Sequence, residues 1–267
     1  MGSVSQLGAQ LESTIRSAIS SSHITNPWSV PALPHPPPTC MQAARDTQRL
    51  RQVLAQPTAV IRGDAQGRAI SAFVQAERHT LFVAATGSGK SLLPLLATRE
   101  TESVTLIIAP YVALRADLHA RGASVAPDNY HLWRQLADDG AHAACPTQVT
   151  GVVVATPDEA STKAFKGWLG MVGGEGRLRR VVVDEAHVLL TEASFRGAVA
   201  ELRHISVLHV PLFLTTATLP VEEEPLLAAC LGIAPPDLVV IRGPVARPNL
   251  AFKVKYQPHK LCSSTLH

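Results

Sequence analysis

The segment 84–91, AATGSGKS, places two glycines, three hydroxyl side chains and one lysine within eight residues. It follows the apolar run 81–85 and precedes a stretch with helical spacing, 91–99. A glycine-rich turn between a strand and a helix directs backbone N–H groups, and the positive end of the helix, at one anion. We expect Lys90 to bind the β- and γ-phosphates of ATP and to act in catalysis, and the Ser91 hydroxyl to bind Mg²⁺. The residues predicted to cradle the phosphates are Thr86, Gly87, Ser88, Gly89, Lys90 and Ser91.

A second group of reactive side chains, Asp184-Glu185-Ala186-His187, follows the apolar run 180–183. Asp184 is expected to bind Mg²⁺ directly or through water, and Glu185 to orient and deprotonate an attacking water molecule. Two adjacent carboxylates repel each other, so a cation is expected between them and the phosphates. His187 is placed to pass the state of the γ-phosphate to a neighbouring strand. Together the two segments predict a nucleotide hydrolase.

Short apolar runs alternate with stretches of helical spacing along most of the chain. Strands are predicted at 81–85, 104–109, 151–155, 180–183, 211–215, 237–241 and 250–256, and helices at 41–56, 91–99, 111–120, 158–169, 195–205 and 220–231. Gly122 and Gly232 stand where helices are expected to end. This alternation predicts a doubly wound α/β fold, with a mostly parallel sheet and helices on both faces.

Composition sets the limits of the domain. The chain has 267 residues, of which 46% are hydrophobic, and this suffices for one buried domain of about 200 residues. Residues 1–39 are rich in Ser and Pro and are expected to be a disordered arm, followed by a domain over 40–256 and a tail over 257–267. The net charge of +3 is too small to demand a nucleic-acid partner. No run reaches the roughly 18 apolar residues of a membrane span, so we expect an intracellular protein without a membrane partner.

The pair AATGSGKS and VVVDEAH resembles motifs I and II of the superfamily 2 DEAD/DEAH-box helicases. Segments 107–110, 154–157 and 215–218 resemble motifs Ia, Ib and III, and Gln66 resembles the glutamine that reads the adenine edge. The resemblance implies a RecA-like domain that binds Mg²⁺ and ATP. It also implies that Thr216, Ala217 and Thr218 couple hydrolysis to strand movement. Thr156 and Arg115 would touch the backbone of a nucleic acid, although Thr156 serves equally well as a plain helix cap.

Three details resemble the RecQ branch of DNA helicases: the Phe195-Arg196 pair, the Thr-Ala-Thr core at 216–218, and the segment 247–250, RPNL. This resemblance implies 3′–5′ unwinding of DNA rather than RNA, a role in recombination and repair, and a nuclear location. The chain departs from the pattern at Ile61-Arg62, one residue further from Gln66 than the usual Phe-Arg pair, and at 188–194, which lacks an aromatic residue.

The sequence stops at His267 without a second α/β array, so motifs V and VI are not found in it. We therefore expect the ATP-binding half of a helicase, which needs a second RecA-like domain in cis or in trans and hydrolyses ATP slowly alone. Two alternatives stay open. One is another superfamily 2 enzyme, an RNA helicase or a duplex translocase, and the other is a degenerate nucleotide-binding module without enzymatic activity.

Overall fold

A single seven-stranded sheet forms the centre of the molecule. The computed structural model describes residues 37–138, 148–192 and 208–244, together with positions 197, 198, 202, 205 and 253. The strands follow the order β3-β4-β2-β5-β6-β1-β7, and every paired neighbour is parallel. Their bounds are β1 His79–Val83, β2 Val104–Ile108, β3 Tyr130–Leu132, β4 Gly151–Ala155, β5 Leu178–Val183, β6 Leu212–Thr216 and β7 Leu238–Arg242.

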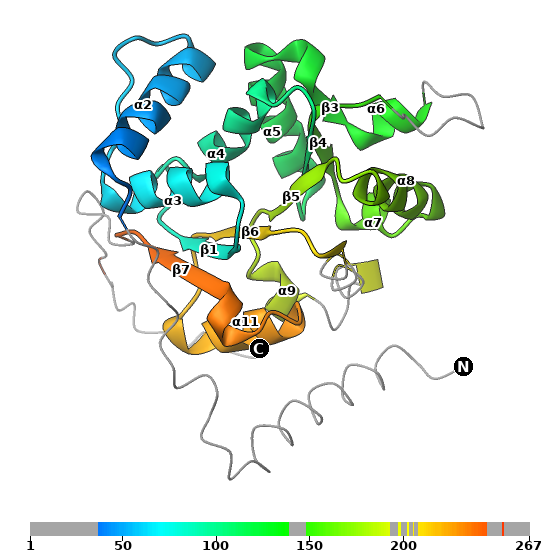
Figure 1. Ribbon diagram of the computed structural model, residues 1–267. Coiled ribbons are helices and arrows are strands. Elements are labelled where there is room, and N and C mark those ends of the chain that lie inside the picture. The colour runs from blue at the N-terminus through cyan, green and yellow to red at the C-terminus, as the bar shows by residue number, and fades with distance from the viewer. Residues whose placement is uncertain are drawn as a thin grey trace, which may run out of the picture.

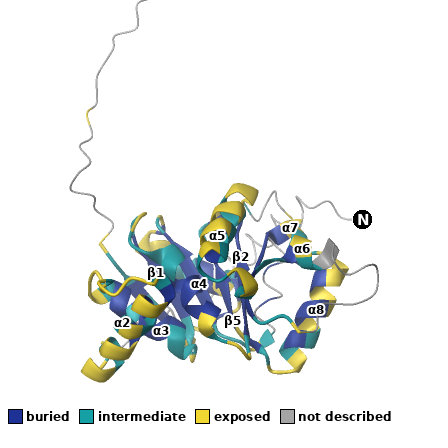
Figure 2. Cartoon of the chain, turned by 90° about the horizontal axis from the view of Figure 1, so that it is seen from above, coloured by how far each residue is buried: buried dark blue, intermediate teal, exposed yellow. Residues whose placement is uncertain are grey.

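Helices cover both faces of the sheet (Figure 1). One face carries α2 Cys40–Leu54, α3 Asp64–Gln75, α4 Leu93–Leu96 and α5 Val112–Val125, and the other carries α6 Trp133–Asp138, α8 Lys163–Gly174, α9 Val188–Thr191 and α11 Glu224–Cys230. Successive strand residues point to opposite faces, so Val181 and Val183 enter one apolar core and Val182 enters the other. Figure 2 shows the strands buried between helices whose outer surfaces are exposed. The doubly wound α/β prediction is confirmed.

The helix after the glycine-rich loop is irregular, which the sequence analysis did not predict. In place of one helix over 91–99, a 3₁₀ turn Lys90–Leu92, the short helix α4 and a second 3₁₀ turn Ala97–Arg99 follow one another. Pro94 has no N–H to donate to the carbonyl oxygen of Lys90, which instead accepts from Leu93 in a 3₁₀ bond. The loop is therefore followed by a tight turn rather than by a regular first turn of α-helix.

Other boundaries differ for local reasons. The stretch 158–169 divides into α7 Pro157–Ala160 and α8, because the Thr162 side chain caps a new helix by accepting from the N–H of Phe165. Helix α5 continues past Gly122 to Val125, so the expected stop there is wrong. Gly232, with φ 66°, does follow the end of α11. Strand β3 was not predicted because it has only three residues, and α3 was also missed.

Several predictions fall outside the described residues: most of the arm at 1–39, most of the helix at 195–205, nearly all of the strand at 250–256, and the tail at 257–267. Within the part of the chain that is described, no helix has both the length and the apolar character needed to cross a bilayer.

Candidate nucleotide-binding site

The predicted chemical groups meet at one edge of the sheet. All paired strands are parallel, and β5, β6 and β1 are neighbours, so the segments that follow them leave the sheet side by side at its carboxyl edge. The 84–91 loop follows β1, Asp184 and Glu185 follow β5, and the 216–218 segment ends β6. An edge of this kind is where doubly wound sheets bind ligands.

The 84–91 loop closes around its own lysine. Lys90 Nζ donates to the carbonyl oxygens of Ala84, at 2.6 Å, and Ala85, at 3.1 Å. Gly87 and Gly89 have φ values of 84° and 94°, in the left-handed region that favours glycine. The side chain of Lys90 thus lies over the loop, within reach of any anion that the loop binds.

Polar groups in this loop lack partners within the described part of the chain. The Ser88 Oγ is buried and has no hydrogen-bond partner. The backbone N–H groups of Gly87 and Gly89 donate to no acceptor among the described residues. A buried hydroxyl is rarely left unpaired, and the Ser88 hydroxyl, with the N–H groups of the more exposed Gly87 and Gly89 beside a lysine, suits an anion. The loop therefore fits the phosphates of a nucleotide.

Gln66 lies against the same loop. Its Oε1 accepts from the N–H of Arg62 at 2.6 Å, and its Nε2 donates to the carbonyl oxygen of Ser88 at 3.3 Å. A Cβ atom added to Gly89 would overlap Gln66 Nε2, so a larger residue at 89 would displace this glutamine. The structure places Gln66 at the phosphate loop, while its contact with an adenine stays a prediction.

Asp184 is held by three backbone and side-chain contacts. Its N–H donates to the carbonyl oxygen of Ile108 at 3.0 Å. Its Oδ1 accepts from the Thr215 hydroxyl at 2.6 Å and from the N–H of Glu185 at 3.1 Å. Glu185 has φ 47°, which is uncommon outside glycine and costs about 1–3 kcal/mol at a site where the surroundings enforce it. The Asp184 carboxylate is thus held by strand β6, and the Glu185 backbone is strained.

His187 links the carboxylates to β6. Its Nδ1 lies 3.0 Å from the Thr216 hydroxyl and 3.3 Å from Glu185 Oε2. The Thr216 hydroxyl in turn accepts from the N–H of Thr218 at 3.2 Å, and Ala217 lies in the bend between them. This continuous path joins Glu185 to Thr218, as the expected coupling role requires, and the coupling itself stays a prediction.

The predicted Mg²⁺ ligands have further partners that the sequence did not reveal. The Ser91 hydroxyl accepts from Arg121 Nη1 of α5 at 3.0 Å. Thr215, the partner of Asp184, lies in the 215–218 segment, but its role was not predicted from the sequence. A hydroxyl at the end of a strand beside an acidic residue is the signal that could have identified it. A serine hydroxyl and an aspartate carboxylate are hard oxygen donors, which suit Mg²⁺.

Thr156 and Arg115 belong to one internal network. Thr156 caps α7 by accepting from the N–H of Glu159 at 3.3 Å, and Glu159 Oε2 accepts from the N–H of Thr156 at 2.8 Å. Arg115 forms an ion pair with Glu159. Thr156 is 4% exposed and the Arg115 side chain 11% exposed. The cap interpretation of Thr156 is confirmed, and direct contact of either side chain with a nucleic acid stays a prediction that requires this network to open.

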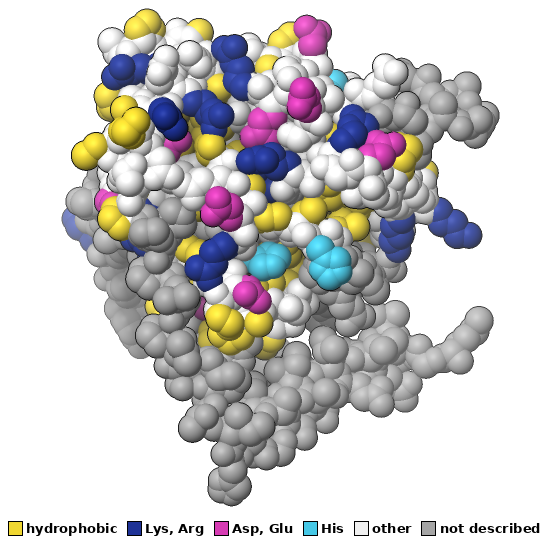
Figure 3. Space-filling model, viewed as in Figure 1, with side chains coloured by type: hydrophobic (Ala, Val, Ile, Leu, Met, Phe, Trp, Pro, Cys, Tyr) yellow, Lys and Arg dark blue, Asp and Glu magenta, His cyan; other side chains and the backbone are white. Residues whose placement is uncertain are grey.

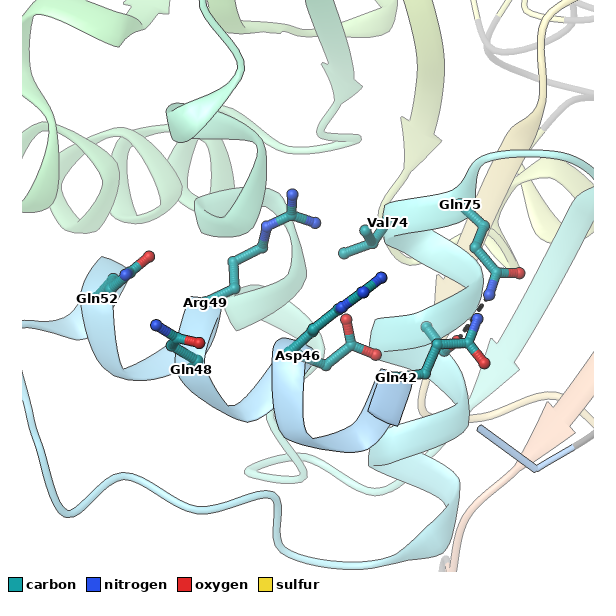
Figure 4. Close-up of a pocket in the computed structure, with 9 residues that line it drawn as sticks. Gln42, Asp46, Gln48, Arg49, Gln52, Val74 and Gln75 are labelled. Carbon is teal, nitrogen blue, oxygen red and sulfur yellow. Dashed lines mark hydrogen bonds between the residues drawn. The ribbon is translucent and has the colours of Figure 1, made fainter. Parts of the chain in front are cut away.

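Two hollows in the described surface lie away from the carboxyl edge of the sheet. A groove of about 490 Å³ between α2 and α3 is lined by four glutamines, two arginines and Asp46 (Figure 4). Arg179, in the amino-terminal half of β5, donates to the carbonyl oxygens of Val74 and Gln75, which places that end of the groove at the amino edge of the sheet. A second hollow of about 520 Å³ surrounds His79 at the start of β1. Neither shares a lining residue with the 84–91 loop.

The charges on the surface are mixed. On the face shown in Figure 3, basic and acidic side chains of the described residues are interspersed. The small net charge of +3 agrees with this pattern. Any nucleic-acid contact on that face would therefore rest on a few donors at the loops rather than on a large basic surface.

Comparisons with known proteins agree with the motifs. A family model described as DEAD/DEAH box helicase matches residues 64–225, which is more than half of the chain. The match includes the phosphate loop, both carboxylates and the 216–218 segment, and it excludes α2.

Two solved helicases share the fold, and a third is similar over a smaller part of the chain. The DUF1998 helicase MrfA, solved bound to DNA, is 17% identical with a TM-score of 0.54, over 74% of this chain and 30% of that chain. A hypothetical ATP-dependent RNA helicase from Sulfolobus tokodaii is 18% identical with a TM-score of 0.50, over 72% of this chain and 56% of that chain. The Hef helicase domain from Pyrococcus furiosus is 17% identical with a TM-score of 0.45, over 65% of this chain and 37% of that chain. The chain thus spans 30–56% of the length of these three solved chains.

Proposed function

The chain belongs to the DEAD/DEAH box helicase family, and from this premise we propose that it is the ATP-binding half of a RecQ-like DNA helicase. The observation that carries the proposal is that a loop with an unpartnered buried hydroxyl, that of Ser88, lies at the same sheet edge as the Asp184 carboxylate, which accepts a hydrogen bond from Thr215 of β6. The loop supplies a place for ATP, and the contacts to β6 supply a route by which hydrolysis can move the protein.

In the proposed reaction a water molecule attacks the γ-phosphorus, the bond to the β–γ bridging oxygen breaks, and ADP and inorganic phosphate form. Lys90 exchanges the carbonyl oxygens of Ala84 and Ala85 for phosphate oxygens. Ser91 and Asp184 would hold Mg²⁺, which would supply positive charge to the phosphate oxygens. Glu185 orients the water molecule and accepts its proton.

The state of the site then reaches β6 through His187. Because His187 Nδ1 lies near both the Glu185 carboxylate and the Thr216 hydroxyl, a movement of that carboxylate changes the contact with β6. We propose that Thr216, Ala217 and Thr218 carry this change toward the bound strand. Thr156 and Arg115 follow neighbouring strands at the same edge, and they are our candidates for contact with the nucleic-acid backbone.

Turnover also needs a positive charge opposite the γ-phosphate. We propose that a second RecA-like domain, in cis or in trans, supplies it as an arginine. Without such an arginine, phosphoryl transfer slows by roughly a thousandfold or more. The chain alone should therefore bind Mg²⁺ and ATP, hydrolyse ATP slowly and unwind no duplex.

The resemblance to RecQ helicases is the basis for three parts of the proposal. These are DNA as the substrate, 3′–5′ polarity, and a nuclear role in recombination and repair. That resemblance lies in the Thr-Ala-Thr core at 216–218, in Phe195-Arg196 and in the 247–250 segment. The latter two fall outside the described residues. The DNA assignment is accordingly the part of the proposal that most needs a direct test.

The test is phosphate release by the full chain with Mg²⁺ and ATP, in the presence of single-stranded DNA or of RNA with the same sequence. Glu185→Gln is the control, because it keeps the site's shape and removes the proton acceptor. We expect DNA to change the slow turnover of the wild type more than RNA does, and Glu185→Gln to abolish turnover. Stronger activation by RNA would overturn the DNA assignment and leave the nucleotide site intact.

A further inference from the structure

An arginine of α5, 30 residues further along the chain, contacts Ser91 of the phosphate loop. Arg121 Nη1 donates to the Ser91 hydroxyl at 3.0 Å, and the same guanidinium forms an ion pair with Asp117, one turn earlier in α5. The side chains of Arg121 and Asp117 are 51% and 52% exposed, so neither is locked in the core. The guanidinium is thus shared between a carboxylate on its own helix and the residue next to Lys90.

The neighbouring glycine sets the position of Arg121. A Cβ atom added to Gly122 would overlap the ring of Tyr130, so the glycine allows α5 to pack closely against β3. This explains a glycine inside a helix, where it is otherwise unfavourable. Because α5 packs closely at residue 122, the position of the adjacent Arg121 relative to β3 is fixed. The Arg121 side chain extends from α5 to Ser91.

The buried Tyr130 also reports the charges around it. Burial raises the pKa of its phenol, the negative charge of Asp184 raises that pKa further, and the positive charge of Arg121 lowers it. Asp184 and Arg121 therefore both lie within electrostatic reach of one phenol. The guanidinium on Ser91 and Asp184, which on our proposed function binds Mg²⁺ together with Ser91, thus act on the same phenol.

We propose that Arg121 is an intrinsic cation of the phosphate loop, occupying the Mg²⁺ ligand Ser91 when the metal is absent and giving way to Mg²⁺ when the metal and nucleotide bind together. The inference rests on the proposed function, since it assumes that this loop binds a nucleotide. A divalent ion held by the Ser91 hydroxyl would meet the guanidinium that donates to the same oxygen at 3.0 Å, and like charges repel. Asp117 is placed to take up the guanidinium when it leaves.

This arrangement alters how strongly nucleotide binding depends on Mg²⁺. Without Mg²⁺, the guanidinium can donate to phosphate oxygens and offset part of their charge. With Mg²⁺, the same guanidinium opposes the metal. Arg121→Gln should therefore weaken nucleotide binding without Mg²⁺ by roughly tenfold, the equivalent of one charge-assisted hydrogen bond, and leave binding with Mg²⁺ unchanged or tighter.

Asp117→Asn should act in the opposite direction. It removes the carboxylate that receives the guanidinium, so Arg121 stays longer on Ser91 and opposes Mg²⁺ more strongly. The gain in nucleotide affinity on adding Mg²⁺ should then be smaller than in the wild type. Arg134→Gln, which removes an exposed arginine from α6, is the matched control for the loss of one positive charge.

The experiment measures the dissociation constant of a fluorescent ADP analogue on the full chain, once with excess EDTA and once with Mg²⁺. The readout is the dissociation constant in EDTA divided by the dissociation constant in Mg²⁺. Circular dichroism confirms that each variant is folded. The proposal expects the ratio to rise about tenfold in Arg121→Gln, to fall in Asp117→Asn and to stay at the wild-type value in Arg134→Gln. An unchanged ratio in Arg121→Gln, with the wild type binding normally, overturns this inference alone. A wild type that binds no analogue in either condition overturns the proposed function and this inference together.

Discussion

Thr215→Val removes one hydrogen bond from Asp184 and keeps the shape of the side chain. The Thr215 hydroxyl donates to Asp184 Oδ1 at 2.6 Å, and Thr215 is 2% exposed, so water cannot easily replace it. A hydrogen bond to a charged group contributes about 1.5–3 kcal/mol. In the variant, the N–H of Glu185 at 3.1 Å remains as a donor to the same oxygen, which is not enough to fix the carboxylate.

A factor of ten in rate corresponds to about 1.4 kcal/mol, so the loss of this hydrogen bond should slow ATP turnover by roughly 10- to 150-fold. Nucleotide binding should change little, because the loop donors and Lys90 are untouched. The assay is single-turnover phosphate release with saturating Mg²⁺ and ATP, beside a binding titration of the same protein.

Thr215→Ser is the matched control, since it keeps the hydroxyl and should retain turnover close to the wild type. Urea denaturation of both variants separates a local effect from unfolding. If Thr215→Val turns over within twofold of Thr215→Ser, the hydrogen bond to Asp184 does not position that carboxylate, and the proposed link between the acidic site and β6 is wrong.

Three further changes test other parts of the structure. Arg180→Met should lower the free energy of unfolding by about 1.5–3 kcal/mol, measured in urea, because it removes a charged hydrogen bond at 2.8 Å to Glu100, which keeps Arg179 as a partner at 3.8 Å. A loss below about 1 kcal/mol would contradict this prediction. Asp46→Asn should raise the free energy of unfolding at pH 7, because burial raises the pKa of the Asp46 carboxyl, against an opposing effect of Arg49. The folded chain therefore favours the protonated form and loses stability as pH rises through the raised pKa. The gain should vanish near pH 3, and equal gains at both pH values in thermal melts would refute the assignment. Gly89→Ala should weaken nucleotide binding at least tenfold, because φ of 94° and the contact with Gln66 both oppose a Cβ atom, and unchanged affinity in a titration would contradict this.

The sheet and the location of the site could be predicted because their signals are local. The apolar runs at 106–108, 151–155 and 181–183, which lie in β2, β4 and β5, have one interpretation in an α/β protein, which is a strand covered on both faces. In a parallel sheet all strands end at the same edge. The loop after β1 and the carboxylates after β5 must therefore reach that edge together. The sequence therefore suffices to predict that Lys90, Ser91, Asp184 and Glu185 lie at the same edge of the sheet.

Contacts between distant side chains could not be predicted. Ser91 and Arg121 are 30 residues apart, and Glu100 and Arg180 are 80 residues apart. Nothing near either arginine indicates its partner, because the contact depends on the rotation and tilt of the packed elements. Gly122 illustrates the same limit: it resembles a helix stop, and only the ring of Tyr130 above it explains why the helix continues.

The central claim is that the 84–91 loop binds a nucleotide through Lys90 and that this site belongs to a DNA-dependent motor. The most direct test is calorimetric titration of Mg²⁺ and ATP into the full chain and into Lys90→Ala, with and without single-stranded DNA. We predict that the wild type binds ATP, that DNA changes its affinity or its slow turnover, and that Lys90→Ala binds at least tenfold more weakly. Equal binding by the two proteins, or no binding by either, would contradict the claim.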